Sequence, residues 1–171
     1  MEDSDKVPNV YAQLTLPQVI DMEKMQFSTS INAPKTKVWD TMLQDATYRV
    51  WTSAFNPGGS WYEGDWNQGS TIRFLGPGED GELGGMVGRI KENRLYDFVS
   101  IEHLGLIRDG VEDTTSEAVK KWAPAFENYT FNEKDGATEV LVDMDIDEEH
   151  KAIFQVMWPK ALQKLKELAE A

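Results

Sequence analysis

The chain contains no cysteine and only two histidines among its 171 residues. The absence of cysteine excludes a disulfide scaffold, a cysteine-ligated zinc site and a thiol nucleophile. Apolar runs are short, and none approaches the about 20 residues that a membrane-spanning helix needs. The start of the chain is acidic and lacks the apolar stretch of a secretory signal. We therefore expect a cytoplasmic protein that folds without disulfides and does not insert into a membrane.

Positive charge is also scarce, because 17 lysines and arginines stand against 30 aspartates and glutamates, a net charge of −13. Such a surface repels a polyanion, which argues against a nucleic acid as partner. Aromatic residues, by contrast, make up 11% of the chain and include six tryptophans. Disordered chains are poor in aromatic residues, so we expect most of the chain to be folded.

The first 22 residues differ from the rest of the chain, since they carry Pro8 and Pro17 and show no sustained hydrophobic period. We interpret residues 1–22 as an N-terminal extension, and whether it is ordered stays open at this point. Residues 23–171 then form one domain, which is the usual number for a chain of this length.

The beginning of this domain combines a strand with helical signals. Residues 23–32 alternate apolar and polar side chains, which predicts a strand. Pro34 suits the first turn of a following helix. A second helical stretch comes next, with an apolar stripe formed by Val50, Trp51, Ala54 and Phe55.

Short strands separated by turns dominate the middle of the chain. We place them at about residues 60–66, 70–76, 83–93, 96–107, 125–133 and 137–146. Asp135-Gly136 between the last two is typical of a hairpin. The charged segment 108–122 has weak periodicity, so we expect a loop or a short helix there.

The last segment, about residues 148–170, gives the clearest helical pattern. Its apolar face is formed by Phe154, Trp158, Ala161, Leu165 and Leu168. Pro159 lies inside this pattern, and because it removes one backbone hydrogen bond it predicts a kink near residues 154–158 or a broken first turn.

This order of elements predicts an α+β fold. Strands that follow one another without crossover helices pair antiparallel, and one long helix can bury one face of their sheet. We expect a curved antiparallel sheet wrapped around the C-terminal helix, with two short helices after the first strand. A sheet curved around a single helix tends to leave a cavity between them.

Local motifs occur in the same order as in a known superfamily. They include Ile31-Asn-Ala-Pro34, Gly64-Asp-Trp-Asn-Gln-Gly-Ser70 and Trp158-Pro159. Over about residues 24–169 the chain resembles the START-like (SRPBCC, birch-pollen-allergen-like) superfamily of the helix-grip fold. Within it, the chain is similar to the activator of the ninety-kilodalton heat-shock protein ATPase. The superfamily contains lipid carriers, hormone receptors, cyclases and chaperone activators, so the resemblance implies the fold and leaves the function open.

Two polar residues are candidates for chemistry. His103 lies on the strand face that we expect to point toward the long helix, where it can orient a ligand or act as an acid or base. The alternative is a core histidine hydrogen-bonded to a neighbour. Glu127 shares a strand face with Tyr129 and can form an acid/base pair with His103. The alternatives for Glu127 are a salt bridge, with Arg73 or Arg89 as partner, or a simple edge position in the sheet.

Two motifs resemble sites for a phosphate-containing cofactor and for calcium, but each lacks features that such a site needs. Gly76–Gly81 has the spacing G-x-G-x-x-G, but Pro77 removes an amide and two acidic residues repel phosphate, so we interpret it as a turn. Asp143–Asp147 resembles the start of a calcium loop, but the later ligand positions do not fit, and the alternating apolar residues favour a strand. We therefore predict neither a metal nor a cofactor.

Aromatic residues and methionines on predicted inward faces suggest a binding site. The candidate ligand-binding residues are Trp51, Phe55, Trp61, Phe74, Met86, His103, Tyr129, Phe131, Met157 and Trp158. Our first hypothesis is non-catalytic binding of a small hydrophobic or amphipathic molecule. A second is an enzyme of the cyclase or hydrolase kind that uses His103 and Glu127. A third is an interaction module similar to the chaperone activators, with a chaperone as partner. The sequence leaves the oligomeric state open.

Overall fold

The computed structural model describes residues 21–78 and 80–171. Within these ranges the strands form one eight-stranded antiparallel sheet in the order β1-β8-β7-β5-β4-β3-β2, with β6 paired to β5. The strands are β1 (Met22–Ile31), β2 (Trp61–Gly64), β3 (Thr71–Pro77), β4 (Leu83–Arg94), β5 (Phe98–Arg108), β6 (Val111–Asp113), β7 (Ala125–Lys134) and β8 (Ala137–Asp147). Residues 1–20 of the predicted N-terminal extension lie outside the described residues, whereas Met22 already belongs to β1.

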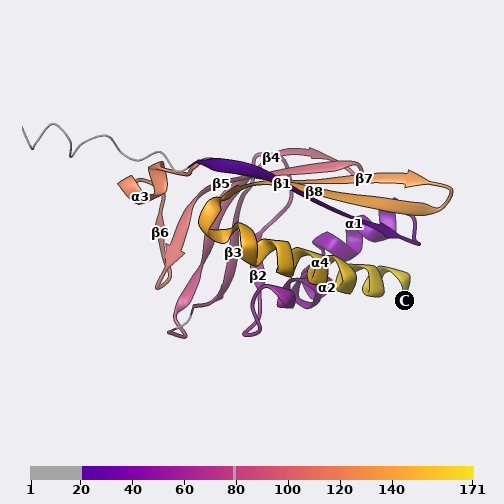
Figure 1. Cartoon of the computed structure of the whole chain (residues 1–171), viewed down its shortest axis with the longest axis horizontal. Helices are drawn as coiled ribbons and strands as arrows, with labels where there is room; N and C mark the ends of the chain where they lie inside the picture. Colours follow the sequence, from indigo (N-terminus) through magenta and orange to yellow (C-terminus); the bar gives the residue numbers. More distant parts are fainter. Residues whose placement is uncertain (1–20, 79) are drawn as a thin grey trace, which may run out of the picture.

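The helices are α1 (Lys35–Leu43), α2 (Asp45–Trp51), the 3-10 turn η2 (Thr52–Ala54), α3 (Glu117–Lys120) and α4 (Glu148–Glu170). The sheet curves over α4, and α1 and α2 lie on the same side of the sheet as α4 (Figure 1). The predicted α+β fold, with two short helices after the first strand and a long C-terminal helix, is thus confirmed. No helix within the described residues is long and apolar enough to cross a membrane.

Irregular pairing between β4 and β5 accounts for part of the curvature. The register shifts between Val87 and Gly88 and again between Ile90 and Glu92, and such bulges bend a strand and increase its twist. Gly105 lets β6 approach β5, because a Cβ atom there would lie 2.1 Å from the carbonyl oxygen of Asp113. The sheet can therefore bend where β6 pairs with β5.

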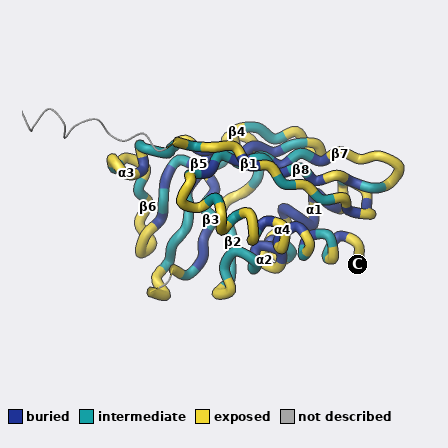
Figure 2. Tube along the Cα trace, viewed as in Figure 1, coloured by how far each residue is buried: buried dark blue, intermediate teal, exposed yellow. Residues whose placement is uncertain are grey.

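The main core lies under the concave face of the sheet, where buried segments of strands and helices meet (Figure 2). Its fully buried members include Ile31, Val38, Met42, Val99, Val140 and Leu165. Trp51 ties α2 to α1, since its indole Nε1 donates to the carbonyl oxygen of Met42 at 2.9 Å. The short helices therefore belong to the core.

Three local predictions need correction. The segment 108–122 contains the short strand β6 as well as the expected short helix, α3. The stripe of the second helix includes Tyr48, which is buried, in place of Val50, which is 47% exposed. The predicted broken first turn of the last helix is wrong, because α4 begins at Glu148 and continues through Pro159. Asp147 stabilises this start, as its carboxylate accepts a hydrogen bond from the backbone N–H of His150.

Leu165 tests the packing of α4 under the sheet. Its exposed fraction is 0%, so Leu165→Ala removes apolar contacts and leaves a cavity. We expect the free energy of unfolding to fall by about 2–5 kcal/mol, measured by urea denaturation. Leu95 is 63% exposed, and Leu95→Ala is the matched control, with an expected change within about 0.5 kcal/mol. Equal losses in the two variants would contradict the packing described here.

Candidate functional site

A cavity of about 530 Å³ lies between the concave face of the sheet and the first half of α4. It forms because α4 packs chiefly on β1, α1, α2 and η2, which leaves the concave face of β3, β4 and β5 incompletely covered at this end. Aromatic rings make up much of its wall. They belong to Tyr48, Trp51, Phe55, Phe74, Trp122, Phe126, Tyr129, Phe154 and Trp158.

Most of the residues predicted from the sequence are brought together in this wall. Those that line the cavity are Trp51, Phe55, Phe74, Met86, His103, Tyr129 and Trp158. They come from α2, from the segment after η2, from β3, β4, β5 and β7, and from α4. Residues about 100 positions apart therefore meet because the sheet curves.

Trp61 does not line the cavity and is a correction to the predicted site. Trp61 pairs with Leu75 in the ladder between β2 and β3, whereas the next residue, Tyr62, pairs with the cavity-lining Phe74. Side chains alternate along a strand, so Trp61 lies on the opposite face, where it packs against the small cluster of Leu75, Val87 and Ile107. Because Trp61 and Tyr62 are both aromatic, the sequence pattern could not predict which of them faces the cavity.

Phe131 and Met157 are also outside the cavity wall. Phe131 lies farther along β7 and packs on Trp39, with 5.1 Å between ring centroids, so it belongs to the filled part of the core. Met157 is half-buried on α4, and its neighbour Trp158 occupies the inward position. Phe131 therefore serves core packing, which is the commoner role of an inward apolar side chain.

Tyr48 and Phe154 are cavity residues that we did not assign to the site. Phe154 lies on the predicted apolar face of the last helix, four residues before Trp158, and this spacing was the available signal. Tyr48 precedes Trp51 by three residues, and the two rings meet edge-on with centroids 5.4 Å apart. Trp122 lies in a segment without clear periodicity, and Phe126 lies in the predicted strand 125–133 on the face opposite to Glu127, so the pattern did not point to either residue.

A chain of polar side chains crosses the aromatic wall. His103 Nε2 lies 3.1 Å from Glu127 Oε1, and the Tyr129 hydroxyl donates to Glu127 Oε2. Both contacts are removed from water, because the His103 and Glu127 side chains are 9% and 15% exposed. The two residues predicted as an acid/base pair are therefore in direct contact. Arg73 and Arg89 pair with other carboxylates, those of Glu63 and Glu102 among them.

The two buried phenols of the cavity retain their protons strongly. Burial raises the pKa of Tyr129 well above its ordinary value, and the Glu127 carboxylate raises it further. Burial and the same carboxylate also raise the pKa of Tyr48. Tyr129 is therefore a neutral hydrogen-bond donor to Glu127.

Two residues that line the cavity, His103 and Trp158, each carry a buried nitrogen atom without a hydrogen-bond partner in the described part of the chain. Among the described residues, neither His103 Nδ1 nor Trp158 Nε1 has a hydrogen-bond partner, although both atoms are buried. Buried polar atoms nearly always find a partner. Both atoms have almost no accessible surface, so they lie behind the wall and do not face the cavity.

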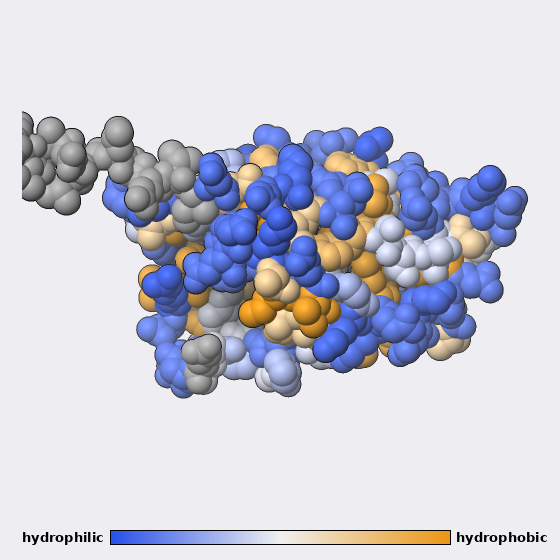
Figure 3. All heavy atoms as spheres, viewed as in Figure 1, coloured by the Kyte–Doolittle hydropathy of each residue, from blue (hydrophilic) through white to orange (hydrophobic). Residues whose placement is uncertain are grey.

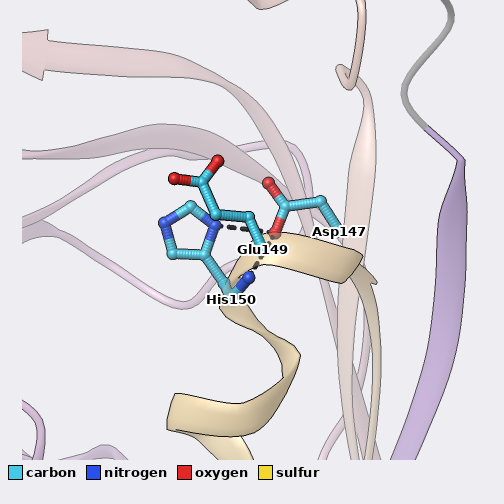
Figure 4. A group of neighbouring side chains, drawn as sticks. All are labelled: Asp147, Glu149 and His150. Atoms are coloured by element: carbon cyan, nitrogen blue, oxygen red, sulfur yellow. Dashed lines mark hydrogen bonds and ion pairs between the residues drawn. The ribbon is translucent and has the colours of Figure 1, made fainter.

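The cavity opens beside the start of α4, where its lining includes Arg108 and His150, which are exposed. Figure 4 shows Asp147, Glu149 and His150 together at the start of α4, with possible metal-ligand atoms of the three side chains within 4.8 Å of one another. His150 Nδ1 lies 2.6 Å from Asp147 Oδ1, the oxygen that also caps α4. Helix capping and one local hydrogen bond between His150 and Asp147 explain this arrangement, so it does not require a metal. Asp143–Asp147 belongs to β8 and does not form a calcium loop.

The surface around α4 is mostly hydrophilic, with a hydrophobic patch near the middle of the face in view (Figure 3). Ile153 and Val156 are exposed residues of α4. Exposed apolar residues of this kind are common on folded proteins, so this patch alone does not identify a partner.

Comparisons with known proteins recognise the fold. No family model and no curated protein matches the chain. A solved structure from Nitrosomonas europaea superposes with a TM-score of 0.66 at 12% identity, covering 85% of this chain and 92% of that one. One from Cytophaga hutchinsonii gives 0.63 at 19% identity, covering 88% and 95%. CalU16 from Micromonospora echinospora gives 0.59 at 15% identity, covering 86% and 76%. At these identities the likeness shows the fold alone.

The raised phenol pKa of Tyr129 predicts a loss of stability in alkali. An unfolded tyrosine releases its proton near pH 10, whereas the folded protein holds the proton to a higher pH. The stabilisation is complete below about pH 10 and is lost as the pH rises through the folded pKa. We expect each such phenol to contribute a slope of up to about 1.4 kcal/mol per pH unit.

Urea unfolding between about pH 9 and 11 measures this slope. Tyr129→Phe removes the titrating group, so the free energy of unfolding of this variant should fall less steeply with pH than that of the unmodified protein. The comparison of slopes is independent of any constant loss of stability from the missing hydroxyl. Identical slopes would show that Tyr129 does not retain its proton as described.

Proposed function

We propose that the protein binds a small hydrophobic or amphipathic molecule in the cavity between its sheet and α4. The observation that carries this proposal is the volume of about 530 Å³ inside a largely aromatic wall. Pockets for small molecules usually measure about 300–1,000 Å³ and combine apolar walls with a few polar groups. The chain His103–Glu127–Tyr129 supplies such polar groups.

The resemblance to the START-like superfamily supports this proposal, because that superfamily includes carriers and receptors that hold apolar molecules in the corresponding space. We assign the chain to this superfamily as part of the proposal. The narrower likeness to the chaperone ATPase activator, and the chaperone partner it implies, remain predictions. Cavity binding ranks first because the aromatic wall has a direct use in it.

Filling the cavity tests the binding function. Ala125 lines the cavity, and Ala125→Phe places a ring inside it. We expect the affinity for N-phenyl-1-naphthylamine, an uncharged dye that fluoresces in apolar surroundings, to fall by about tenfold or more, equivalent to about 1.4 kcal/mol. Fluorescence titration of the dye measures the dissociation constant.

Ala137→Phe is the matched control, because Ala137 lies on β8 away from the cavity and is half-buried. This variant should bind the dye as the unmodified protein does. Urea denaturation of both variants establishes that they are folded under the conditions of the titration. Unchanged dye binding in folded Ala125→Phe would show that the dye binds elsewhere.

An enzyme that uses acid/base chemistry is the second candidate. The contact of 3.1 Å between His103 Nε2 and Glu127 Oε1 favours it, because a carboxylate hydrogen-bonded to a histidine holds the ring in a fixed orientation. The imidazole of His103 would take a proton from a bound molecule, and Glu127 would stabilise the imidazolium that forms. Glu127 is then a positioning residue and His103 the catalytic base.

Deuterium exchange tests this second candidate. In deuterated water, 2-tetralone exchanges the hydrogens next to its carbonyl group when a base removes them and a deuteron returns. If His103 acts as a base, the protein should accelerate this exchange about a hundredfold over His103→Phe, as measured by mass spectrometry of the recovered ketone. Equal rates with both proteins would leave binding as the sole proposed function.

A further inference from the structure

The side chain of Glu127 reaches the cavity. Strand β7 lies between β5 and β8, where Glu127 pairs with Ile101 on one side and with Met144 on the other. The Glu127 side chain lines the cavity and is 15% exposed. Because neighbouring strands flank it on both sides, this exposed fraction faces the cavity. A bound molecule can therefore touch the carboxylate, unlike the buried nitrogen atoms of His103 and Trp158.

In the described part of the chain, this carboxylate has no lysine or arginine partner. It contacts His103 Nε2 at 3.1 Å and accepts a hydrogen bond from the Tyr129 hydroxyl. A carboxylate offers about four lone-pair sites, so these two contacts leave further sites for a donor. A charge that is largely removed from water is costly unless an opposite charge and hydrogen bonds compensate for it. Glu127 therefore has room for a cation and gains from one.

Two other carboxylates of similar burial show how the protein usually compensates such a charge. Glu102, with a side chain that is 10% exposed, lies 3.3 Å from Arg89 Nη2. Asp145, with a side chain that is 16% exposed, lies 2.7 Å from Lys24 Nζ. The position that a basic side chain occupies beside these two carboxylates is open beside Glu127. A positively charged group of a bound molecule can occupy it.

Aromatic rings near Glu127 favour the same kind of group. The ring of Phe74 lies 5.5 Å from that of His103, measured between centroids. The ring of Trp158 lies 6.2 Å from that of Tyr129. The faces of such aromatic rings carry a negative potential that attracts a cation within about 6 Å. The carboxylate and the rings around it therefore favour the same charge, and the rings also contact an apolar body.

The other charges of the lining disfavour an anion. Besides Glu127, the lining includes the carboxylates of Asp145 and Asp147, whereas Arg108 is its one basic residue among the described residues, apart from the histidines. The chain as a whole carries a net charge of −13, which attracts cations from a distance and repels anions. A cation is therefore attracted both on its approach and inside the cavity.

We propose that the cavity selects amphiphilic amines, molecules with a protonated amino group on an apolar body, and that the ammonium group binds Glu127. The inference rests on the proposed binding function and names the chemical class of its ligand. The apolar body occupies the space between the aromatic rings, and the ammonium N–H groups donate to the lone pairs that His103 and Tyr129 leave free. Glu127 is thus a specificity-determining residue.

Three naphthalene probes of similar size test the inference by isothermal titration at about pH 8, where a histidine in water is uncharged. They are 2-naphthylmethylamine, which is a cation, 2-naphthalenemethanol, which is uncharged, and 2-naphthoate, which is an anion. We expect the amine to bind about tenfold more tightly than the alcohol, the effect of one charge-assisted hydrogen bond. The anion should bind more weakly than both. Equal affinities for the amine and the alcohol would refute the inference.

Replacement of Glu127 assigns the preference to its charge. Glu127→Gln keeps the shape of the side chain, and the amine and the alcohol should bind this variant within about twofold of each other. Glu102→Gln is the matched control, because it removes an equally buried carboxylate from β5, outside the cavity lining, and changes the net charge by the same amount. This control should retain the preference for the amine. A preference that persists in folded Glu127→Gln would overturn the assignment to Glu127.

A measurement on the unmodified protein avoids dependence on the folding of a variant. In full-length protein labelled with ¹³C, the amine should shift the side-chain carboxyl resonance of Glu127, and the alcohol should shift it less. Tight binding of the amine without this shift would show that the ammonium group lies elsewhere. Binding of the dye and the alcohol with no preference for the amine would refute the inference and leave the proposed function standing. Failure of every probe and of the dye to bind would refute the proposed function itself.

Discussion

The buried carboxylate of Glu127 is the constraint around which the cavity is organised. A charge removed from water is costly unless hydrogen bonds compensate for it, and His103 and Tyr129 supply both of these bonds. Their side chains must therefore point to the same side of the sheet and stay there. This requirement fixes the positions of three polar side chains in a cavity lining that is otherwise largely aromatic. It also explains why three polar side chains occur on a face that α4 leaves incompletely covered.

The curvature of the sheet determines how much of that face stays open. α4 packs on β1, α1 and α2, so its contacts fill the core on one side of the molecule. The bulges in β4 and β5 and the close approach of β6 at Gly105 carry β3, β4 and β5 away from the helix on the other side of the molecule. Complete filling of the space would bury more apolar surface and increase stability. A cavity with unpaired polar atoms is the kind of local sacrifice of stability that proteins make at sites of function.

Sequence periodicity predicted the order of the elements well, because most strands and α4 present one clear apolar face. It failed where the local pattern carried no preference. Trp61 and Tyr62 are both aromatic, so the alternation of apolar and polar residues could not show which one faces the helix. In α2, Val50 is more hydrophobic than Tyr48, so hydrophobicity alone assigned Val50 to the inner face that Tyr48 occupies. Strand β6 is three residues long and forms through its pairing with β5. Inward faces were predicted for His103 and Glu127, but their contact depends on the register of β5 against β7, in which Ile101 pairs with Glu127 and His103 with Ala125. A register set by long-range pairing cannot be obtained from either strand alone.

The same register gives His103 two distinct roles for its two nitrogens. The nitrogen toward Glu127 is occupied, and its partner carboxylate is fixed in turn by Tyr129, so the ring has little freedom to rotate. The other nitrogen is buried without a hydrogen-bond partner among the described residues. Aromatic rings provide most of the contact area for a guest, but they distinguish poorly between apolar molecules of similar size. Discrimination must then come from the few polar atoms, because leaving one of them unpaired penalises every molecule that lacks the matching group.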